Sequence, residues 1–479
     1  SPHTPRVVVI GGGVTGLSAG FYLEQAARRA GMPLDYLVVE RGDTAGGKIH
    51  TDAFGGYVVE GGADSFLTQK PWALELVRAL GLEAECVPIN SLPHATYVLI
   101  NGRPQPMPPG MTLGIPARLG PFLRSSLLSP WGKARALLDL LHPVQQRIAD
   151  ESLAGCMRRH FGDETLDRIL EPLMSGIHNS LAEEQSLLAT FPRFRDGERK
   201  HGSLINSIKE AQSAHRPNGN KPLPPFMTLR GGMGRLIDAL AHALGDHLRS
   251  DCPVAAVEHY PGEPRPYCIV LASGEVISAD GVILATPAFV SADLIAEFYP
   301  GLACELRAIR YVSTGTVSLA YASDDVGPLP GFGVIIPRSE GRHINAITVS
   351  SRKFAHRAPA DRVLIRAFFG GSRHPHAVEE SDAAILAIAQ RELREILGIT
   401  AAPRIARIWR LRDSSPQYDV GHLHRVASIE SLCPAGLAVA GSAYRGVGIP
   451  DCIKQAQDAA TRILAEVWHD DAIRVATNS

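Results

Sequence analysis

The run VVVIGGGVTG, residues 7–16, restricts the fold of this chain more than any other feature. It places Gly11, Gly13 and Gly16 in Gly-x-Gly-x-x-Gly spacing between an expected strand (7–10) and an expected helix (16–30). Gly11 permits a tight turn, Gly13 lets backbone approach a pyrophosphate, and Gly16 allows the helix to pack closely on the strand. The anion then meets the N-terminus of the helix. The sequence therefore predicts a βαβ unit that binds a dinucleotide.

The residues after the second expected strand (36–39) indicate which dinucleotide is bound. Glu40 follows Gly16 by 24 positions, where a carboxylate accepts hydrogen bonds from ribose hydroxyls. The following run, RGDTAGGK, places Gly46 and Gly47 shortly after Arg41, and this pattern resembles the second signature of the flavin amine oxidase superfamily. Lys48 would complete a phosphate-binding loop, but Ile49 stands where that loop needs Ser or Thr. FAD is therefore the expected cofactor.

Length, charge and cysteine content limit the remaining possibilities. A chain of 479 residues predicts two or three domains. Its 48 basic and 49 acidic residues provide no field that would attract nucleic acid. The seven cysteines are scattered, with no Cys-x-x-Cys pair, which favours a reducing compartment and a cytoplasmic protein.

Membrane attachment stays open at this stage. No apolar run reaches the roughly 18 residues of a membrane span. The segment 113–141, however, mixes apolar side chains with Arg118, Arg124, Lys133 and Arg135, as segments that lie on a membrane surface do. A helical hairpin packed on the protein's own core explains the same pattern equally well.

Metal binding and hydrolysis are not expected. His374 and His376, like His422 and His424, are two positions apart, but the sequence places no third ligand near either pair. A Gly-x-Ser-x-Gly element is also missing from the sequence.

Three further segments fit a flavin. The run VVEGGADS, residues 58–65, offers small residues that backbone could present to the isoalloxazine or ribityl groups, and Val254 is expected to end a strand beside the adenine. The run AGSAYRGVGIPD, residues 440–451, is a second glycine turn that leads into a helix, whose N-terminal amides would stabilise negative charge.

Residues 196–226 are polar and rich in Pro, Asn and Lys, which predicts a loop.

Several longer runs resemble the protoporphyrinogen oxidase family, including its coproporphyrinogen-oxidising bacterial members. They occur in the family's order across most of the chain. The runs are GGADSFL (61–67), EPLMSGI (171–177), SLLATFPRF (186–194), FMTLRGGMG (226–234), GFGVIIPR (331–338), SSRKFAHRAP (350–359), PQYDVGHL (416–423) and YRGVGIPDCI (444–453).

The resemblance implies an α/β fold with a Rossmann-like FAD-binding domain of the p-hydroxybenzoate hydroxylase type, a mixed-sheet substrate domain and a helical insertion. The FAD-binding domain would comprise residues 1–90, 247–300 and 426–479. The substrate domain would comprise residues 91–112, 197–246 and 301–425, and the insertion, which would face a membrane, residues 113–196.

The resemblance also implies site residues. No catalytic side chain is assigned, since the flavin itself would accept hydride, but His178 and Asn179 lie where they would orient a substrate. The expected FAD contacts are Gly11, Gly12, Gly13, Val14, Thr15, Gly16, Glu40, Arg41, Gly46, Gly47, Lys48, Gly62, Ala63, Asp64, Ser65, Val254, Trp409, Gly441, Val447, Gly448 and Ile449. The expected substrate contacts are Thr96, Gly176 at a helix-to-loop conversion, Ile335, Thr348 and Phe368.

The activity implied by the resemblance is the six-electron oxidation of protoporphyrinogen IX to protoporphyrin IX with O₂ as acceptor, in heme biosynthesis. Two alternatives remain: oxidation of coproporphyrinogen III, and a non-catalytic protein that binds flavin or tetrapyrrole. A homodimer, transient contact with ferrochelatase and peripheral membrane contact are left open as partnerships.

The chain departs from the family pattern at positions that bear on substrate choice. Thr96 stands where many members carry an Arg thought to meet a propionate, so Arg103, Lys353 or another base would have to replace it. Asn179 and Ser180 replace a smaller Ala-Gly pair, and Thr348 replaces a larger apolar residue. These differences leave the identity of the porphyrinogen open.

Overall fold

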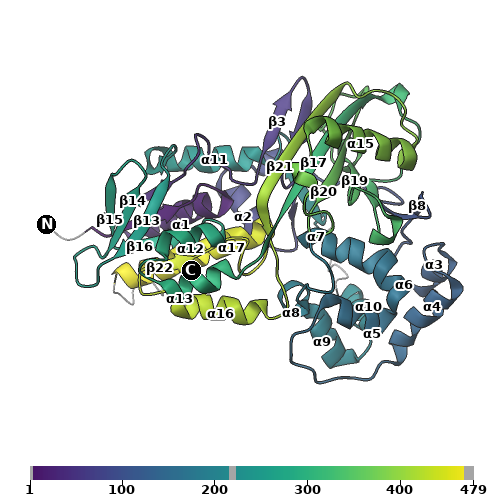
Figure 1. The fold of residues 1–479 in the computed structure, drawn as a ribbon, viewed down its shortest axis with the longest axis horizontal. Coiled ribbons are helices and arrows are strands. Elements are labelled where there is room, and N and C mark those ends of the chain that lie inside the picture. Colours follow the sequence, from purple (N-terminus) through teal and green to yellow (C-terminus); the bar gives the residue numbers. More distant parts are fainter. Residues whose placement is uncertain (1–3, 215–222, 469–479) are drawn as a thin grey trace.

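The computed structural model describes residues 4–214 and 223–468. Figure 1 shows an elongated molecule with three parts: a parallel sheet flanked by helices on the left, a large twisted sheet at upper right and a cluster of helices at lower right. The clustered helices come from residues 119–214, whereas the left-hand part combines the first and last segments with residues 234–307.

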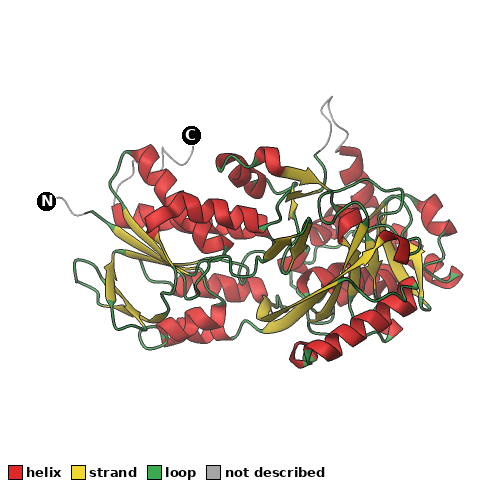
Figure 2. Ribbon diagram, turned by 90° about the horizontal axis from the view of Figure 1, so that it is seen from above, coloured by secondary structure: helices red, strands yellow, loops and turns green. Residues whose placement is uncertain are grey.

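The left-hand part is built on a five-stranded parallel sheet in the order β12-β2-β1-β16-β22. Val7, Val8 and Val9 of β1 are fully buried, as expected for a parallel strand covered on both faces. Helices α1, α11 and α17 pack on one face, and Figure 2 shows helices on both sides of the sheet. The strands and these helices are β12 (Leu248–Arg249), β2 (Asp35–Val39), β1 (Arg6–Ile10), β16 (Gly281–Leu284), β22 (Leu437–Val439), α1 (Val14–Ala30), α11 (Gly234–Leu244) and α17 (Ile449–Trp468).

The upper right part is a seven-stranded mixed sheet in the order β21-β17-β20-β19-β18-β7-β8. Helix α15 (Asp382–Leu397) covers one face, and its apolar side chains form a core with alternate residues of the strands. The strands are β21 (Ile405–Pro416), β17 (Tyr311–Ala322), β20 (Arg362–Gly370), β19 (Ala346–Val349), β18 (Gly333–Ile335), β7 (Thr96–Ile100) and β8 (Arg103–Pro106).

The lower right part is a helical subdomain with its own apolar core, which also contacts Val98 and Ile335 of the large sheet. Its centre is η3, a π-helix that contains Pro172. Its elements are α3 (Leu119–Arg124), α4 (Pro130–Leu137), η2 (Leu138–Leu141), α5 (Leu153–Phe161), α6 (Asp163–Thr165), η3 (Leu166–Ser175), α7 (Gly176–His178), α8 (Leu187–Thr190), α9 (Pro192–His201) and α10 (Leu204–Ala214).

The remaining elements include two three-stranded sheets, β5-β11-β6 and β13-β14-β15, and the helices α12, α13 and α16, which share a core with the second face of the parallel sheet. The strands are β3 (Thr51–Phe54), β4 (Tyr57–Glu60), β5 (Phe66–Leu67), β6 (Cys86–Pro88), β9 (Met111–Thr112), β10 (Ile115–Pro116), β11 (Phe226–Leu229), β13 (Val254–His259), β14 (Tyr267–Leu271) and β15 (Val276–Ala279). The helices are α2 (Trp72–Ala79), η1 (Glu83–Glu85), η4 (Gly245–His247), α12 (Ala288–Ile295), α13 (Pro300–Arg307), η5 (Ser323–Asp325), η6 (Arg338–Glu340), α14 (Ser350–Lys353), η7 (Ala377–Glu379) and α16 (His422–Leu432).

Three local expectations are wrong. Residues 196–226 do not form one loop, because α9 runs to His201 and α10 follows, its Leu204 and Ile205 buried in the core of the helical subdomain. The part of the expected loop at 215–222 lies outside the described residues. Val254 begins strand β13 rather than ending a strand. Gly176 is not a helix-to-loop conversion, since the helix continues to His178 and ends at Asn179, whose φ is 54°.

The structure also bears on the expected domain limits, which stay predictions. The boundary at 196 falls inside α9, and the boundary at 425 falls inside α16. Helix α11, assigned to the substrate domain, buries Leu236 and Leu240 against α1 beside the parallel sheet. The buried apolar side chains of α11 pack in the core beside the parallel sheet.

Candidate functional site

The glycine turn after β1 is held by Glu40. One Glu40 carboxylate oxygen accepts a hydrogen bond from Gly12 N at 2.6 Å, and the other accepts one from Gly42 N at 2.9 Å. Gly46 N donates to Gly12 O at 2.8 Å, which brings the second glycine pair against the first. A Cβ at Gly16 would lie 1.8 Å from Gly11 O, so only glycine allows this approach of helix and turn.

The N-terminus of α1 is open to an anion. Its N-cap residue, Gly13, offers no side-chain acceptor, and the first turn contains no acidic residue. The first backbone N–H groups of a helix have no partner within the helix, and they carry partial positive charge. A pyrophosphate would accept hydrogen bonds from these N–H groups, and its negative charge would complement their partial positive charge.

The loop after β4 contacts both the turn and the large sheet. A Cβ at Gly62 would lie 1.9 Å from Lys48 O, and one at Gly61 would lie 2.7 Å from the ring of Trp409. Arg366 of β20 donates to Gly61 O at 3.0 Å and to Gly62 O at 2.6 Å. The parallel sheet and the large sheet therefore meet at this loop.

Buried charges surround the same loop. Lys353 pairs with Asp64 at 2.8 Å, and Arg366 lies nearby with its guanidinium 4.7 Å from the centre of the Phe368 ring. Burial alone would raise the pKa of Asp64, but Lys353 and Arg366 outweigh it and hold that pKa well below its usual range. Asp64 is therefore ionised at neutral pH, and Lys353 is committed to it.

The turn between β22 and α17 closes the site from the C-terminal side. Lys48 Nζ donates to Ser442 Oγ at 3.1 Å, and burial lowers the pKa of Lys48. The Tyr418 hydroxyl donates to Ser442 O at 2.7 Å and accepts from Gly446 N at 2.8 Å. Residues 447–449 lead directly into α17, beside these contacts.

Strand register places the expected substrate residues on one face of the large sheet. Ile335 lies opposite Ala346, which lies opposite Phe368, and the row continues through Thr316 to Trp409. In the next row, Thr96, Gly333 and Thr348 lead to Arg366. Paired residues in adjacent strands share a face, and residues two apart share it too. This face turns toward the Gly61–Gly62 loop, while the opposite face packs on α15.

Gly176 and its neighbours border that face. An added Cβ at Gly176 would meet no atom within 4 Å. His178 is buried, and its carbonyl accepts a hydrogen bond from Gln417 Nε2 at 3.1 Å. The Asn179 amide donates to Ser415 Oγ at 3.3 Å. These contacts join the end of α7, which follows the π-helix, to β21 and to the segment after β21.

Most of the expected site residues therefore lie in one connected region, but two are peripheral. Arg41 is exposed beyond the turn. Val254 is half-buried, in a segment tied to Glu40 through the bond from Cys252 N to Glu40 O at 2.8 Å. Both lie on the side of the turn that is remote from the substrate face.

Comparison with known proteins shows the family to which the chain belongs. The family model described as flavin containing amine oxidoreductase matches residues 14–464. The chain belongs to the flavin-containing amine oxidoreductase family. Coproporphyrinogen III oxidase of Bacillus subtilis (strain 168) is 35% identical over 97% of this chain and 98% of that protein. Protoporphyrinogen oxidase 1 of the Spinacia oleracea chloroplast is 27% identical over 95% of this chain and 84% of that protein.

Solved structures agree with this membership of the flavin-containing amine oxidoreductase family. A crystal structure from Exiguobacterium sp. 255-15, assigned provisionally to the protoporphyrinogen oxidases, has a TM-score of 0.84 and 31% identity, covering 98% of this chain and 100% of that chain. Putrescine oxidase has a TM-score of 0.70 at 17% identity, covering 97% and 99% of the two chains, and shows the fold alone. The expected kinship with the protoporphyrinogen oxidase family and the expected fold class are confirmed.

FAD is the cofactor of this family, and the residues present fit it. A Cβ at Gly13 would meet only Gly47 Cα, at 3.9 Å, so the backbone there is open to a ligand, Glu40 lies beside the turn, and the open end of α1 suits a pyrophosphate. The chain is an FAD-dependent oxidoreductase. The individual FAD and substrate contacts remain predictions.

Sequence reasoning missed two residues that organise the site. Arg366 is the only charged residue within the run VLIRAFFG, and a lone Arg in a strand of apolar residues was the available signal. Tyr418, which bridges Ser442 and Gly446, gave no signal, because nothing in the sequence places it near that turn.

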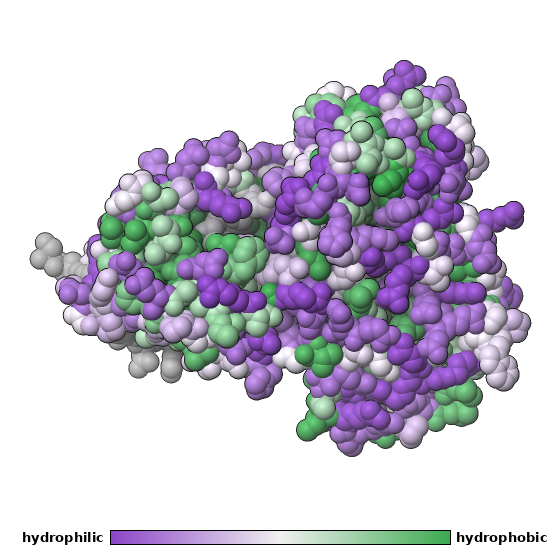
Figure 3. All heavy atoms as spheres, viewed as in Figure 1, coloured by the Kyte–Doolittle hydropathy of each residue, from purple (hydrophilic) through white to green (hydrophobic). Residues whose placement is uncertain are grey.

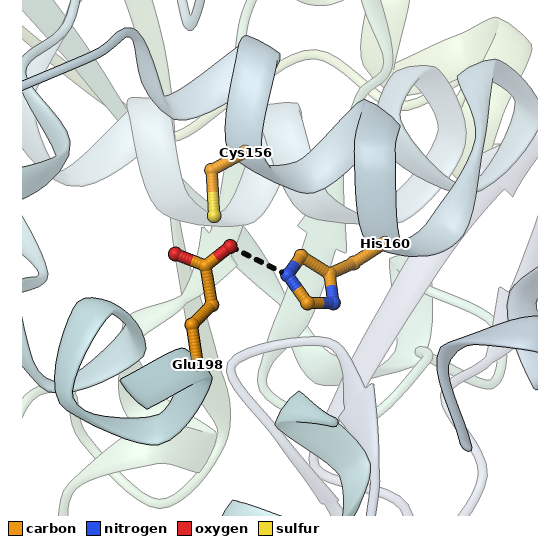
Figure 4. A group of neighbouring side chains, drawn as sticks. All are labelled: Cys156, His160 and Glu198. Atoms are coloured by element: carbon orange, nitrogen blue, oxygen red, sulfur yellow. Dashed lines mark hydrogen bonds and ion pairs between the residues drawn. The ribbon is translucent and has the colours of Figure 1, made fainter. Parts of the chain in front are cut away.

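A second cluster of buried ionisable groups lies away from this site, in the helical subdomain. Figure 4 shows Cys156, His160 and Glu198 pointing toward one another. Among the residues that the structure describes, this is the one set of three whose ligand atoms lie close enough to hold a metal ion, within 4.8 Å of one another. The two histidine pairs considered from the sequence are not part of it.

The polar atoms of this cluster already have partners. His160 is hydrogen-bonded to Asp139 through Nδ1 and to Glu198 through Nε2, the latter at 2.9 Å. Arg159 and Arg195 engage the two oxygens of Glu198. Burial raises the pKa of the Cys156 thiol, which disfavours the thiolate that a metal would require. We therefore interpret the cluster as an ion network that joins η2, α5 and α9.

None of the helices in the described ranges combines the length and apolarity needed to cross a membrane.

Proposed function

We propose that this oxidoreductase removes six electrons from a porphyrinogen and passes them to O₂. The observation that carries the proposal is the single sheet face bearing Ile335, Thr348 and Phe368, which meets the Gly61–Gly62 loop of the cofactor site. A face that combines Ile335, Ala346 and Phe368 with threonine side chains suits a flat macrocycle, and the names of the relatives supply the substrate class.

The flavin supplies a two-electron acceptor at its ring. The chain's own residues hold the macrocycle against that ring and exclude water. Arg366 fixes the carbonyls of Gly61 and Gly62, while Phe368 and Ile335 present apolar surface on the substrate side. Three successive two-electron steps remove six hydrogen atoms and reduce three O₂ to three H₂O₂, and no protein acid or base is required.

Coproporphyrinogen III is the substrate we propose first, although the resemblance led us to expect protoporphyrinogen IX. The named relatives with 30–35% identity are coproporphyrinogen III oxidases. The spinach relative keeps protoporphyrinogen IX as the alternative. Of the two bases considered for propionate recognition, Lys353 is paired with Asp64, whereas Arg103 is exposed at the start of β8.

The deciding experiment mixes the FAD-loaded protein in air with either porphyrinogen, each prepared anaerobically, and follows porphyrin fluorescence and H₂O₂. About three H₂O₂ per porphyrin would establish the reaction, and the faster substrate would identify the preference. If protein that retains FAD produces neither porphyrin fluorescence nor H₂O₂ from either porphyrinogen, the proposal is refuted.

His178→Ala should retain substantial turnover. Burial, with a smaller contribution from Lys70, lowers the pKa of His178 to about 4, so the ring is neutral at pH 7. Its contacts to Gln417 and Ser415 use the backbone carbonyl, which the substitution keeps. The check is the initial rate of porphyrin formation. Complete loss of rate with FAD still bound would show that the imidazole takes part.

Contact with a membrane surface is the second part of the proposal. Leu123, Trp131, Leu138 and Leu141 of the helical subdomain are 46–83% exposed. Figure 3 shows hydrophobic atoms on the surface at lower right, over this subdomain. Arg124 and Lys133 lie in the same helices, as on surfaces that bind anionic lipid. Arg135 has another role, because it donates to the carbonyls of Arg158, Arg159 and His160 at the end of α5.

The double substitution Trp131→Ala/Leu141→Ala should release the protein from vesicles that contain phosphatidylglycerol. Each large side chain contributes about 1.5–3 kcal/mol when it is buried in the interface, so binding should fall at least tenfold. Co-sedimentation with vesicles measures this, with the exposed Val276→Ala as control. Equal sedimentation of all three proteins would exclude this surface as the attachment site.

The other expected partnerships, a homodimer and transient contact with ferrochelatase, stay predictions, as does the cytoplasmic location. All seven cysteines are free, which supports a reducing compartment.

A further inference from the structure

A cavity of about 340 Å³ lies behind the substrate face, between the large sheet and α15. Val317 and Phe369 line it from the strands, and Ile385, Ile388 and Ala389 line it from the helix. Ligand pockets begin at roughly 300 Å³, so the space suits a small molecule. The apolar walls require an apolar body.

One end of the cavity carries a half-buried cation, Arg373, which feels the charge of Glu171 but forms no ion pair within the described ranges. Arg373 lines the cavity and donates a hydrogen bond to the Ile336 carbonyl at 2.7 Å. Its Nε is buried without a partner, and no carboxylate of the described ranges forms an ion pair with it. Burial lowers the pKa of Arg373, and the Glu171 carboxylate offsets part of this effect. A buried guanidinium is stable when a carboxylate engages it in two hydrogen bonds.

The neighbouring histidines extend this polar end. His374 Nε2 is buried without a partner, and the His343 ring centre lies 6.4 Å from that of His374. His376 and Glu380 also line the cavity. Burial and the neighbouring Arg373 lower the pKa of His374, so Nε2 becomes a donor only when a ligand carboxylate beside it favours the protonated imidazole. Glu380 repels an anion, so the carboxylate is expected at Arg373 and His374.

We propose that this cavity binds an amphipathic monocarboxylic acid, with its carboxylate against Arg373 and His374 and its hydrocarbon body between Phe369 and Ile388. The site is distinct from the flavin site, because Phe369 and Val317 project from the opposite face of the strands that carry Phe368 and Thr316. It nevertheless adjoins the substrate face through Ile336, the residue after Ile335, whose carbonyl Arg373 holds.

The test uses the FAD-loaded protein and three probes in isothermal titration: octanoate, octan-1-ol and acetate. Octan-1-ol keeps the apolar body without the charge, and acetate keeps the charge without the body. We expect one octanoate site per chain, with both other probes at least tenfold weaker. Equal affinity for octanoate and octan-1-ol, or no octanoate binding, would overturn the proposal.

Two variants locate the site. Arg373→Gln removes the cation, and Ile388→Trp fills the cavity from α15; each should weaken octanoate binding at least tenfold. Arg412→Gln is the matched control, since Arg412 is an exposed arginine of β21 paired with Glu379. Octanoate binding that survives Ile388→Trp would place the probe elsewhere and refute the proposal. If Arg373→Gln does not fold, as judged by bound flavin, Arg373→Lys and Ile388→Trp still decide the result.

Discussion

Arg366→Ala is expected to give a folded protein that no longer retains FAD. The guanidinium donates to the carbonyls of Gly61 and Gly62, the loop that separates the large sheet from the cofactor turn. It also helps to keep Asp64 ionised. Removing one member of a buried charged network costs about 3–5 kcal/mol. If this free-energy cost falls on the conformation of the Gly61–Gly62 loop, affinity for FAD falls on the order of 100-fold or more.

The measurement is the ratio of flavin to protein absorbance after gel filtration, with circular dichroism to confirm folding. Arg407→Ala is the matched control, because Arg407 lies in the same row two strands away, in a half-exposed ion pair with Asp52. Surface pairs of that kind contribute about 0–1 kcal/mol. Full flavin content and full turnover in Arg366→Ala would show that the loop does not depend on this residue.

His160→Gln is expected to destabilise the helical subdomain by about 3–5 kcal/mol, because it leaves two buried carboxylates without the cation between them. Burial alone would lower the pKa of His160, but the hydrogen bonds that its ring donates to Asp139 and Glu198 raise it. Burial alone would raise the pKa of Glu198, but His160 and Arg159 lower it to about 2. The folded protein therefore favours the protonated form of His160 more than the unfolded chain does.

These shifts fix the sign of the pH dependence. A raised histidine pKa adds stability that is fully present below the unfolded value of 6.5 and is lost as pH rises through the folded value. A lowered carboxylate pKa adds stability that is present above the unfolded value of 4.5 and is lost as pH falls toward 2. The difference between the parent and His160→Gln should therefore be largest between pH 4.5 and 6.5 and should shrink at higher pH.

Urea unfolding followed by circular dichroism, repeated across this pH range, measures the difference. Arg158→Gln is the control, since its pairs with Asp163 and Glu183 are half-exposed on the same helix. A difference between the parent and His160→Gln that stays constant with pH would show that His160 is not charged in the folded protein.

The sequence predicted those parts of the site whose chemistry is local. The turn from Gly11 to Gly16 can be recognised from small residues at fixed spacing. Glu40 can be recognised from its position at the end of the next expected strand. The shared face of Ile335, Thr348 and Phe368 came from family resemblance, because no local pattern fixes which strands pair. Strand register, which decides that face, depends on contacts between residues far apart in the chain.

The features that the sequence did not predict depend on partners far along the chain. Arg366 matters because Gly61 and Gly62 approach it from 304 or more positions away. The cluster of Asp139, His160 and Glu198 unites three helical segments, none of which carries a ligand pattern of its own. The polar, Pro-, Asn- and Lys-rich composition of residues 196–226 predicts a loop, and it does not reveal that Leu204, Ile205 and Ile208 of α10 are buried in the core of the helical subdomain.

The parallel sheet collects strands from residues 6–10, 35–39, 248–249, 281–284 and 437–439, and α17 completes its cover. The cofactor cradle therefore cannot close during synthesis before residues 437–468 have been made. Until then, one backbone edge of β16 has no partner strand and the apolar side chains of α1 that face α17 have no cover. A chain that stops before α17 would therefore expose apolar surface and be prone to aggregation.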